Sequence, residues 1–475
     1  MTCYLLCCSS IRRPGNGHLC GESTPRPQPA RGKPRRSLSS SPLDFDCSVW
    51  DRPSIGPHDR ERLPMSAPRV GSEIGRLRKV LVHKPGIELA RLTPRNRESF
   101  LFEDILWVER ARDEHDRFVE LLRSRGAEVL HLRTLLEEVL EDEGLRREVV
   151  NRLVPPVVCG PRLSRYLRRH LRESSPADLV DVLLGGLLRE DLKARGIDPL
   201  FADLISDRYD WVLPPLPNLF FMRDNASWIG DGLSLNVLAS PARASESVLV
   251  RAIYRHHPLF ADLDFPTWYG DEAADRFPAT VEGGDILVLD EETVLIGCGE
   301  RTAPAAVEIL AHRLFDGSPV RNMIVAHFRR ERAVMHLDTV LTMVDVNRFN
   351  FYPGILDGLE VYLLRPGRGG KLSVLRTDGL EKAIAACLPR DDTQFITSGK
   401  DGIDHIREQW DDGHNTLALE PGVVVSYARN RETNRRLRDA GVEVLELDAS
   451  ELCRGRGGSR CMTQPLLRDE VDWNR

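Results

Sequence analysis

The sequence lacks the marks of a membrane, zinc or phosphate-binding protein. No apolar run in its 475 residues approaches the roughly 20 that a helix needs to cross a bilayer. The apolar residues 4–8 are too few for a secretory signal and follow no basic segment. The 10 cysteines include no Cys-x-x-Cys pair and no zinc-type Cys/His spacing, so reduced thiols in a cytoplasmic protein are expected.

A general excess of positive charge is also missing. The formal net charge is −6, with 29% charged and 41% hydrophobic residues, which is the ordinary balance of a globular protein. The charge is uneven, because residues 1–64 carry a net +4 and leave −10 for residues 65–475. The composition therefore predicts no nucleic-acid partner.

Residues 1–64 differ in composition from everything that follows. They hold nine of the 31 prolines, a basic run at 31–36 and a serine-rich run at 37–41, with almost no hydrophobic periodicity. Such a composition is typical of a disordered extension. One interpretation is a regulatory or targeting arm. We favour the other interpretation, in which Met65 is the native start and the extension is not part of the native protein.

Hydrophobic spacing predicts short strands and helices after this extension. A strand at 79–85 stops at a proline, a helix at 102–125 is closed by Gly126, and a strand follows at 128–132. Leucine-rich helical stretches without strand signals then follow, at 135–153, 161–171, 176–192 and 199–206. We therefore expect an α/β domain formed by residues 69–133 and 208–475, with a helical bundle of residues 134–207 inserted into it.

Strand signals return after Trp211 and alternate with helices. Residues 285–289 and 293–297 predict a hairpin, and the next helix is expected to have Thr302 as its N-cap and Pro304 in its first turn. Further strands are expected at 322–326, 339–345, 359–364, 423–427 and 442–447, and further helices at 379–387 and 431–440. This order indicates a mixed α/β fold that is neither a doubly wound sheet nor a sandwich, and no internal repeat is evident in the sequence.

Four short segments are rich in residues that a folded core would not choose: 217–225, 281–285, 335–339 and 454–462. The last contains Cys461 after a run of glycines and arginines. A cysteine is usually a small buried hydrophobe. A loop of this composition, however, can be flexible and electropositive, and nearby cations stabilise the nucleophilic thiolate. We therefore expect Cys461 to be a nucleophile.

Candidate acid–base groups lie in the other segments. His336 and Asp338 alternate on a predicted strand, so both should point to one face, where a histidine beside a carboxylate suits proton transfer. A lone strand histidine is more often structural. Glu282 precedes two glycines that let backbone approach a ligand closely, with a plain turn as the alternative. Asp224 is a further candidate carboxylate, with an ion pair to Arg223 as the alternative.

Together, a thiol, a histidine and several carboxylates favour a planar cationic electrophile. A guanidinium presents a fork of donors that carboxylates bind in a bidentate manner. Its resonance-stabilised carbon needs both a strong nucleophile and a positioned proton donor. Arg243 and Arg301 would then bind the carboxylate of a free amino acid.

The same segments resemble the signature segments of the arginine deiminases. Residues 92–94, 104–108, 241–243 and 299–302 also match that pattern, and the resemblance runs in order from about residue 70 to residue 472. The resemblance implies a pentein fold, a five-bladed α/β propeller that carries the helical insertion. Residues 1–64 have no counterpart in the pattern.

The resemblance also implies a reaction, the hydrolysis of L-arginine to L-citrulline and ammonia in arginine catabolism, without a cofactor or a metal. Cys461 would attack the guanidinium carbon to form a covalent thiouronium-type intermediate. His336 would protonate the departing ammonia and then activate water. Asp224 and Asp338 would hold the guanidinium nitrogens, and Glu282 would support the histidine and the substrate.

Further implied substrate contacts lie around these groups. Asn218, Arg243 and Arg301 would bind the amino-acid end of arginine, and Phe221 would line the pocket. Gly455 and Arg456 would belong to a mobile gating loop. A cytoplasmic homo-oligomer, either a dimer or a tetramer, is the expected state.

Alternatives remain at this stage. Agmatine deiminases, dimethylarginine hydrolases and amidinotransferases share the propeller and the cysteine, although Arg243 and Arg301 disfavour agmatine, which has no α-carboxylate. A propeller that binds arginine without catalysis and an Arg/Gly-rich RNA binder through residues 454–460 are weaker alternatives. The first would have no use for the complete set of thiol, histidine and carboxylates. The second has only a short basic run in an acidic chain.

Overall fold

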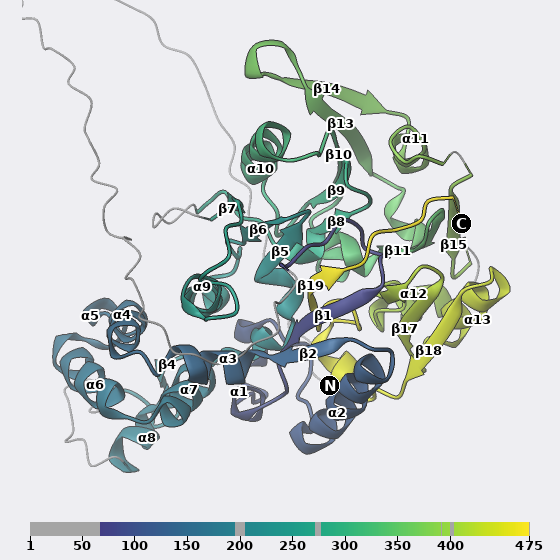
Figure 1. Cartoon of the computed structure of the whole chain (residues 1–475). Helices are drawn as coiled ribbons and strands as arrows, with labels where there is room; N and C mark the ends of the chain where they lie inside the picture. Colours follow the sequence, from purple (N-terminus) through teal and green to yellow (C-terminus); the bar gives the residue numbers. More distant parts are fainter. Residues whose placement is uncertain (1–66, 195–204, 271–276, 391, 400–402, 475) are drawn as a thin grey trace, which may run out of the picture. The chain divides into compact units, whose positions relative to one another are not determined.

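A strand–strand–helix–strand unit recurs in this protein. The computed structural model describes residues 67–194, 205–270, 277–390, 392–399 and 403–474. In one such unit, β5 (Ala226–Ile229) and β6 (Gly232–Leu235) form an antiparallel hairpin, α9 (Ala244–His256) crosses over, and β7 (Thr267–Tyr269) returns parallel to β6 (Figure 1). Antiparallel neighbours need only a tight turn, whereas the parallel return needs a crossover helix.

Four other sheets in the described part of the chain repeat this order. In three of them the hairpin, the crossover helix and the parallel return strand are β8 (Ile286–Val288), β9 (Thr293–Cys298), α10 (Pro304–Gly317) and β10 (Asn322–His327); β11 (Leu341–Asp345), β12 (Arg348–Phe351), α11 (Leu380–Ala385) and β15 (Gln394–Thr397); and β16 (Leu417–Glu420), β17 (Val423–Tyr427), α13 (Arg431–Asp439) and β18 (Glu443–Leu447). The sheet of β8, β9 and β10 is extended by the antiparallel strands β13 (Glu360–Pro366) and β14 (Leu372–Thr377). The repeat that the sequence did not reveal is therefore present in the topology.

The fifth unit joins the two ends of the described chain. β1 (Leu77–Val82) is followed by α2 (Val108–Ser124) and by β2 (Glu128–His131), which runs parallel to β1. The antiparallel partner of β1 is β19 (Gln464–Arg468), so the purple and yellow strands lie side by side in Figure 1. A pairing between the first and last strands brings the cysteine-bearing C-terminal loop back to the start of the domain.

The central strands of these sheets are continuous apolar runs in the sequence. Every residue of β9 and of β17 is buried, as expected for a strand with hydrogen-bonded neighbours on both sides and packed faces. The predicted hairpin at 285–297 and the predicted strands at 322–326, 423–427 and 442–447 are confirmed. Local apolar runs bounded by turns therefore predicted the strands well.

The predicted helix at 102–125 begins six residues late. Its end is confirmed, because Gly126 has a φ of +88° after the C-cap, a conformation that glycine adopts without steric cost. Its start is wrong, because Leu101 has a φ of +66° and α2 begins only at Val108. Phe102 and Leu106 are four residues apart, as on a helix, but they lie in an irregular segment, and both side chains are buried.

Six helices occupy the described residues between β2 and β4 (Trp211–Leu213): α3 (Leu132–Val139), α4 (Glu143–Leu153), α5 (Pro156–Cys159), α6 (Pro161–Glu173), α7 (Pro176–Gly185) and α8 (Arg189–Ala194). The predicted stretch 135–153 is divided, because Asp142 caps a new helix by accepting from the amide of Leu145 at 2.6 Å. The short strand β3 (Leu187–Leu188) pairs with β4, where no strand was expected. Most of the predicted helix at 199–206 lies outside the described residues.

The helical segment shares its core with the sheets. Buried leucines such as Leu136, Leu167 and Leu183 belong to the same apolar cluster as Leu249 and Ile253 of α9. Among the described residues, no helix is both long enough and apolar enough to cross a bilayer.

A buried carboxylate fixes the cysteine-bearing loop to α2. Glu114 accepts hydrogen bonds from the amides of Ser450, Glu451 and Leu452 at 3.1, 2.9 and 3.2 Å, and from Arg110 at 3.0 Å. Burial alone would raise the pKa of Glu114, but these bonds lower it below its ordinary value. Its contribution to stability is therefore present above the unfolded-state pKa and is lost as the pH falls through the folded-state pKa.

We predict that Glu114→Gln weakens this attachment. The amide carries no charge and offers one acceptor oxygen in place of two, so two or more donors lose their partner at a cost of about 1–3 kcal/mol in unfolding free energy. Urea denaturation at pH 7 should show a lower midpoint with an unchanged slope. Glu120→Gln, on the exposed side of the same helix, is the control. Equal midpoints for the two variants would contradict the prediction.

Candidate active site

The predicted catalytic residues occupy equivalent places in the repeated units. Asp224 ends the 3₁₀ turn η5 (Met222–Asp224) just before β5, and Glu282 precedes the turn η7 (Gly283–Asp285) that leads into β8. His336 precedes the turn η9 (Leu337–Thr339) before β11, and Cys461 lies three residues before β19. Each of these residues lies just before the first strand of a different unit. The repeated fold therefore brings together residues that are far apart in the sequence.

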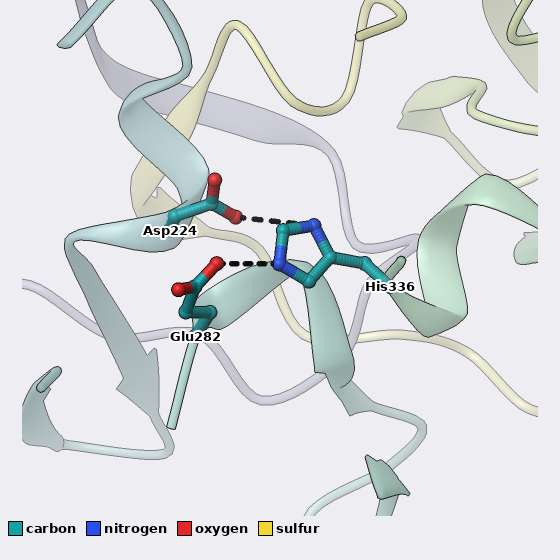
Figure 2. Close-up of side chains that lie close together, drawn as sticks. All are labelled: Asp224, Glu282 and His336. Atoms are coloured by element: carbon teal, nitrogen blue, oxygen red, sulfur yellow. Dashed lines mark hydrogen bonds and ion pairs between the residues drawn. The ribbon is translucent and has the colours of Figure 1, made fainter. Parts of the chain in front are cut away.

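His336 lies between two carboxylates (Figure 2). Its Nε2 is 2.7 Å from Glu282 Oε2, and its Nδ1 is 3.7 Å from Asp224 Oδ1. Burial alone would lower the pKa of His336, but Asp224 and the hydrogen bond and charge of Glu282 raise it to about 9. The imidazole is therefore protonated at neutral pH and poised as a proton donor.

Two arginines balance these carboxylates. Arg243 Nη1 lies 2.7 Å from Asp224 Oδ2 and 3.7 Å from Glu282 Oε2, and Arg301 Nη1 lies 3.5 Å from the same oxygen of Glu282. Burial would raise the pKa of Glu282, but His336, Arg301 and Arg243 lower it far below its ordinary value. Glu282 is therefore a permanent anion that holds the imidazolium.

A cation site is the alternative for this cluster. Asp224, Glu282 and His336 each present one atom that can ligate a metal, and these atoms lie within 4.8 Å of one another. A protonated imidazole has no lone pair to donate, however, and the two carboxylates already face Arg243 and Arg301. The cluster therefore favours a hydrogen-bonded proton donor over a metal site.

Cys461 is held by a residue that the sequence did not single out. Its thiol accepts a hydrogen bond from Asn415 Nδ2 at 3.0 Å and donates to Asp338 Oδ2 at 3.5 Å. The Cys461 amide donates to Asn415 Oδ1 at 3.0 Å. Asn415 lies just before β16, which is the position that the other site residues occupy in their units. Recognition of the repeat would have revealed it.

The expectation that loop cations stabilise the Cys461 thiolate is wrong. Burial, then Asp338, Asp224 and Asp412, raise the pKa of the thiol well above its ordinary value, and Arg460 opposes them. Arg460 is already paired with Glu73 at 2.9 Å and with Asp338 at 2.8 Å. The thiol is therefore neutral here, because burial and the carboxylates outweigh the arginine.

The glycines of this loop serve close packing. A Cβ on Gly457 would lie 2.3 Å from the Phe221 ring, and one on Gly458 would lie 2.5 Å from the carbonyl oxygen of Asn415. Both distances are below any normal contact, so only glycine fits. The Gly/Arg-rich run that the sequence associated with flexibility therefore packs tightly against Phe221 and Asn415.

A small cavity connects the predicted residues. Nine of the eleven line it: Asn218, Phe221, Asp224, Arg243, Arg301, His336, Gly455, Arg456 and Cys461. The other two, Glu282 and Asp338, contact His336 and Cys461. The cavity volume is about 20 Å³, room for a single water molecule. An amino acid can therefore enter only if lining side chains move.

Two local expectations are corrected, and one alternative interpretation is excluded. His336 and Asp338 do not alternate on a strand, because Asp338 lies in η9 and the amide and hydroxyl of Thr339 both donate to the carbonyl of His336. Thr302 is not an N-cap, since α10 is preceded by Ala303 and the Thr302 hydroxyl donates to Asp285 Oδ2 at 2.6 Å. Asp224 pairs with Arg243 rather than with its neighbour Arg223.

Gly284 provides a test of how the histidine is placed. A Cβ at this position would lie 2.7 Å from His336 Nδ1 and 3.0 Å from its Cβ, so Gly284→Ala must displace the ring. We predict a loss of about 100-fold in kcat for the reaction that His336 supports, because displacements near 1 Å cost this much. Gly71→Ala is the matched control, since its Cβ meets Glu291 at an ordinary 3.5 Å. Equal rates for the two variants would exclude this placement.

Comparisons with known proteins identify the family. The family model described as arginine deiminase matches residues 98–468. The arginine deiminase of Rhodococcus erythropolis (strain PR4 / NBRC 100887) is 43% identical over 406 residues, which cover 85% of this chain and 98% of that protein.

Similar solved structures are more distant. A complex of an AgrE mutant with L-arginine is 13% identical, with a TM-score of 0.48, over 84% of this chain and 40% of AgrE. SxtG, an amidinotransferase from Microseira wollei in the saxitoxin biosynthetic pathway, is 14% identical, with a TM-score of 0.45, over 85% of this chain and 98% of SxtG. On the family model and the relative from Rhodococcus, this chain belongs to the arginine deiminase family.

Proposed function

We propose that this protein hydrolyses free L-arginine to L-citrulline and ammonia through a covalent intermediate on Cys461. The observation that carries the proposal is the convergence of one thiol, one imidazolium and the carboxylates of Asp224, Glu282 and Asp338 at one cavity, in a chain of the arginine deiminase family. No bound metal or cofactor is needed for this chemistry, because the substrate itself supplies the positive charge.

Substrate binding would activate the nucleophile. The guanidinium lies between Asp224 and Asp338, where its charge offsets two of the carboxylates that raise the pKa of Cys461. The thiol then releases its proton to water, and Asn415 Nδ2 donates a hydrogen bond to the resulting thiolate. The reactive thiolate would therefore form mainly when arginine is bound.

Two half-reactions follow. The thiolate attacks the guanidinium carbon, and a C–N bond breaks as His336 gives its proton to the departing amino group, which leaves as ammonia. The product of this step is an S-alkyl thiouronium cation on Cys461. His336, now neutral and held by Glu282, takes a proton from water, whose oxygen attacks the same carbon. The C–S bond then breaks, the departing thiolate takes the hydroxyl proton of the adduct, and neutral citrulline leaves.

The amino-acid end of arginine would meet Asn218, Arg243 and Arg301. Asn218 Nδ2 donates to the carbonyl of Phe100 at 2.8 Å, and Arg301 pairs with Glu300 and Glu282. Phe221 would cover the aliphatic stem. Gly455 and Arg456 would gate the entrance, where the Arg456 guanidinium now lies 3.6 Å over the Trp410 ring.

The proposal extends to the architecture and state of the protein. Five repeated units and the pairing of β1 with β19 support a five-bladed α/β propeller, with residues 134–207 as an inserted helical domain in the catalytic domain of 69–133 and 208–475. We also propose a cytoplasmic homo-oligomer, either a dimer or a tetramer, without a nucleic-acid or membrane partner. The five cysteines of the described part are free, in keeping with a reducing compartment. The predicted extension 1–64 lies outside the described residues.

Replacement of the nucleophile tests the reaction. Cys461→Ser should lower the rate of citrulline formation from arginine by about 10³-fold or more, since a hydroxyl attacks a guanidinium far more weakly than a thiolate. Cys298→Ser, at another buried cysteine beside a separate cavity, should retain activity. The same assay with agmatine, with methylated arginines and with an added amine acceptor distinguishes this activity from those of agmatine deiminases, dimethylarginine hydrolases and amidinotransferases. Undiminished citrulline formation in Cys461→Ser would refute the mechanism.

The pH profile tests the proton donor. Because the pKa of His336 is raised to about 9, its protonated form is present below that value and is lost as the pH rises through it. We predict that kcat/KM falls on an alkaline limb near pH 9. Glu282→Gln removes one of the charges that raise this pKa, so its alkaline limb should move to lower pH. A limb that stays in place would assign the titration to another group.

A further inference from the structure

Arg243 connects two carboxylates from different elements. It ends the turn η6 (Pro241–Arg243), and Glu246 follows in the first turn of α9. Arg243 Nε lies 3.1 Å from Glu246 Oε1, and its Nη2 lies 3.0 Å from Glu246 Oε2, which is a bidentate pair. Its remaining nitrogen, Nη1, faces Asp224 Oδ2 at 2.7 Å. Both Arg243 and Glu246 are almost completely buried.

This arrangement fills the proposed substrate position with a guanidinium of the protein itself. Asp224 is one of the two carboxylates proposed to hold the guanidinium of arginine, yet in the structure it pairs with Arg243. The cavity beside it has room for one water molecule. A substrate guanidinium can therefore bind Asp224 only after Arg243 Nη1 has left it.

We propose that Glu246 is a positioning residue, the fixed pivot on which Arg243 transfers its Nη1 from Asp224 to the α-carboxylate of the substrate. This inference rests on the proposed function. The bidentate bond to Glu246 uses Nε and Nη2 and leaves Nη1 free to change partner. Glu246 is not among the residues of the cavity wall, so it acts through Arg243.

The exchange selects for a ligand with two opposite charges. When arginine binds, its guanidinium takes Asp224 and its carboxylate receives Arg243, so every buried charge keeps a partner. Agmatine offers the guanidinium alone, and Arg243 would then leave Asp224 without an anion in return. An unpaired buried charge is costly. Glu246 and Arg243 therefore form a specificity device for free amino acids.

Comparison of arginine and agmatine in Glu246→Gln tests the pivot. Wild-type enzyme must first form citrulline from arginine, and failure here would refute the proposed function itself. In the variant we expect the KM for arginine to rise at least 10-fold with kcat changed less than threefold. The inhibition constant of agmatine against arginine should rise by less than threefold, because both ligands must displace Arg243 from Asp224 but only arginine has a carboxylate that Arg243 then binds.

Two further variants keep the outcome decisive. Asp290→Asn neutralises another buried carboxylate, in the turn between β8 and β9, and should leave both constants unchanged. Glu246→Asp retains the charge on a shorter side chain. It should also raise the arginine KM more than the agmatine inhibition constant, by a smaller factor, and it provides the test if Glu246→Gln does not fold. An unchanged KM for arginine, or a parallel rise of the arginine KM and the agmatine inhibition constant in these variants, would overturn the inference.

Discussion

The hydrogen bond of 2.7 Å between Glu282 and His336 is the interaction around which the other charges of the site are arranged. It requires a carboxylate and an imidazolium to be buried together, and an isolated buried charge would be very costly. Arg301 and Arg243 balance Glu282 and Asp224, and Arg460 balances Asp338 and Glu73. Each of these buried ions thus keeps a partner, and the cavity that they surround is small.

The same balance explains the state of the nucleophile. Asp338 accepts a hydrogen bond from the Cys461 thiol. Together with Asp224 and Asp412 it disfavours the thiolate. A guanidinium ligand brings the missing positive charge. In the proposed mechanism the substrate therefore completes the electrostatics of the site, and the reactivity of Cys461 depends on its presence.

Repetition in the fold places these groups. Asp224, Glu282, His336, Asn415 and Cys461 each lie just before the first strand of a different strand–strand–helix–strand unit. One structural position, repeated five times in the described residues, thus supplies the nucleophile, its hydrogen-bond donor, the proton donor and two carboxylates. Tight 3₁₀ turns at three of these positions orient the side chains before each strand becomes buried.

The sequence by itself determined what depends on near neighbours: the hairpin of β8 and β9, the end of α2 at Gly126, and the chemical identities of Cys461, His336, Glu282 and Asp224. It could not determine whether the loop stabilises the thiolate of Cys461. Arg460 is paired with Asp338 and Glu73, which are 122 and 387 residues away in the sequence. Nor could it show the repeat, which lies in strand order rather than in residue identity, or the place of Asn415. Tertiary structure decided these features, since ion pairing and burial depend on distances in space that spacing along a chain does not fix.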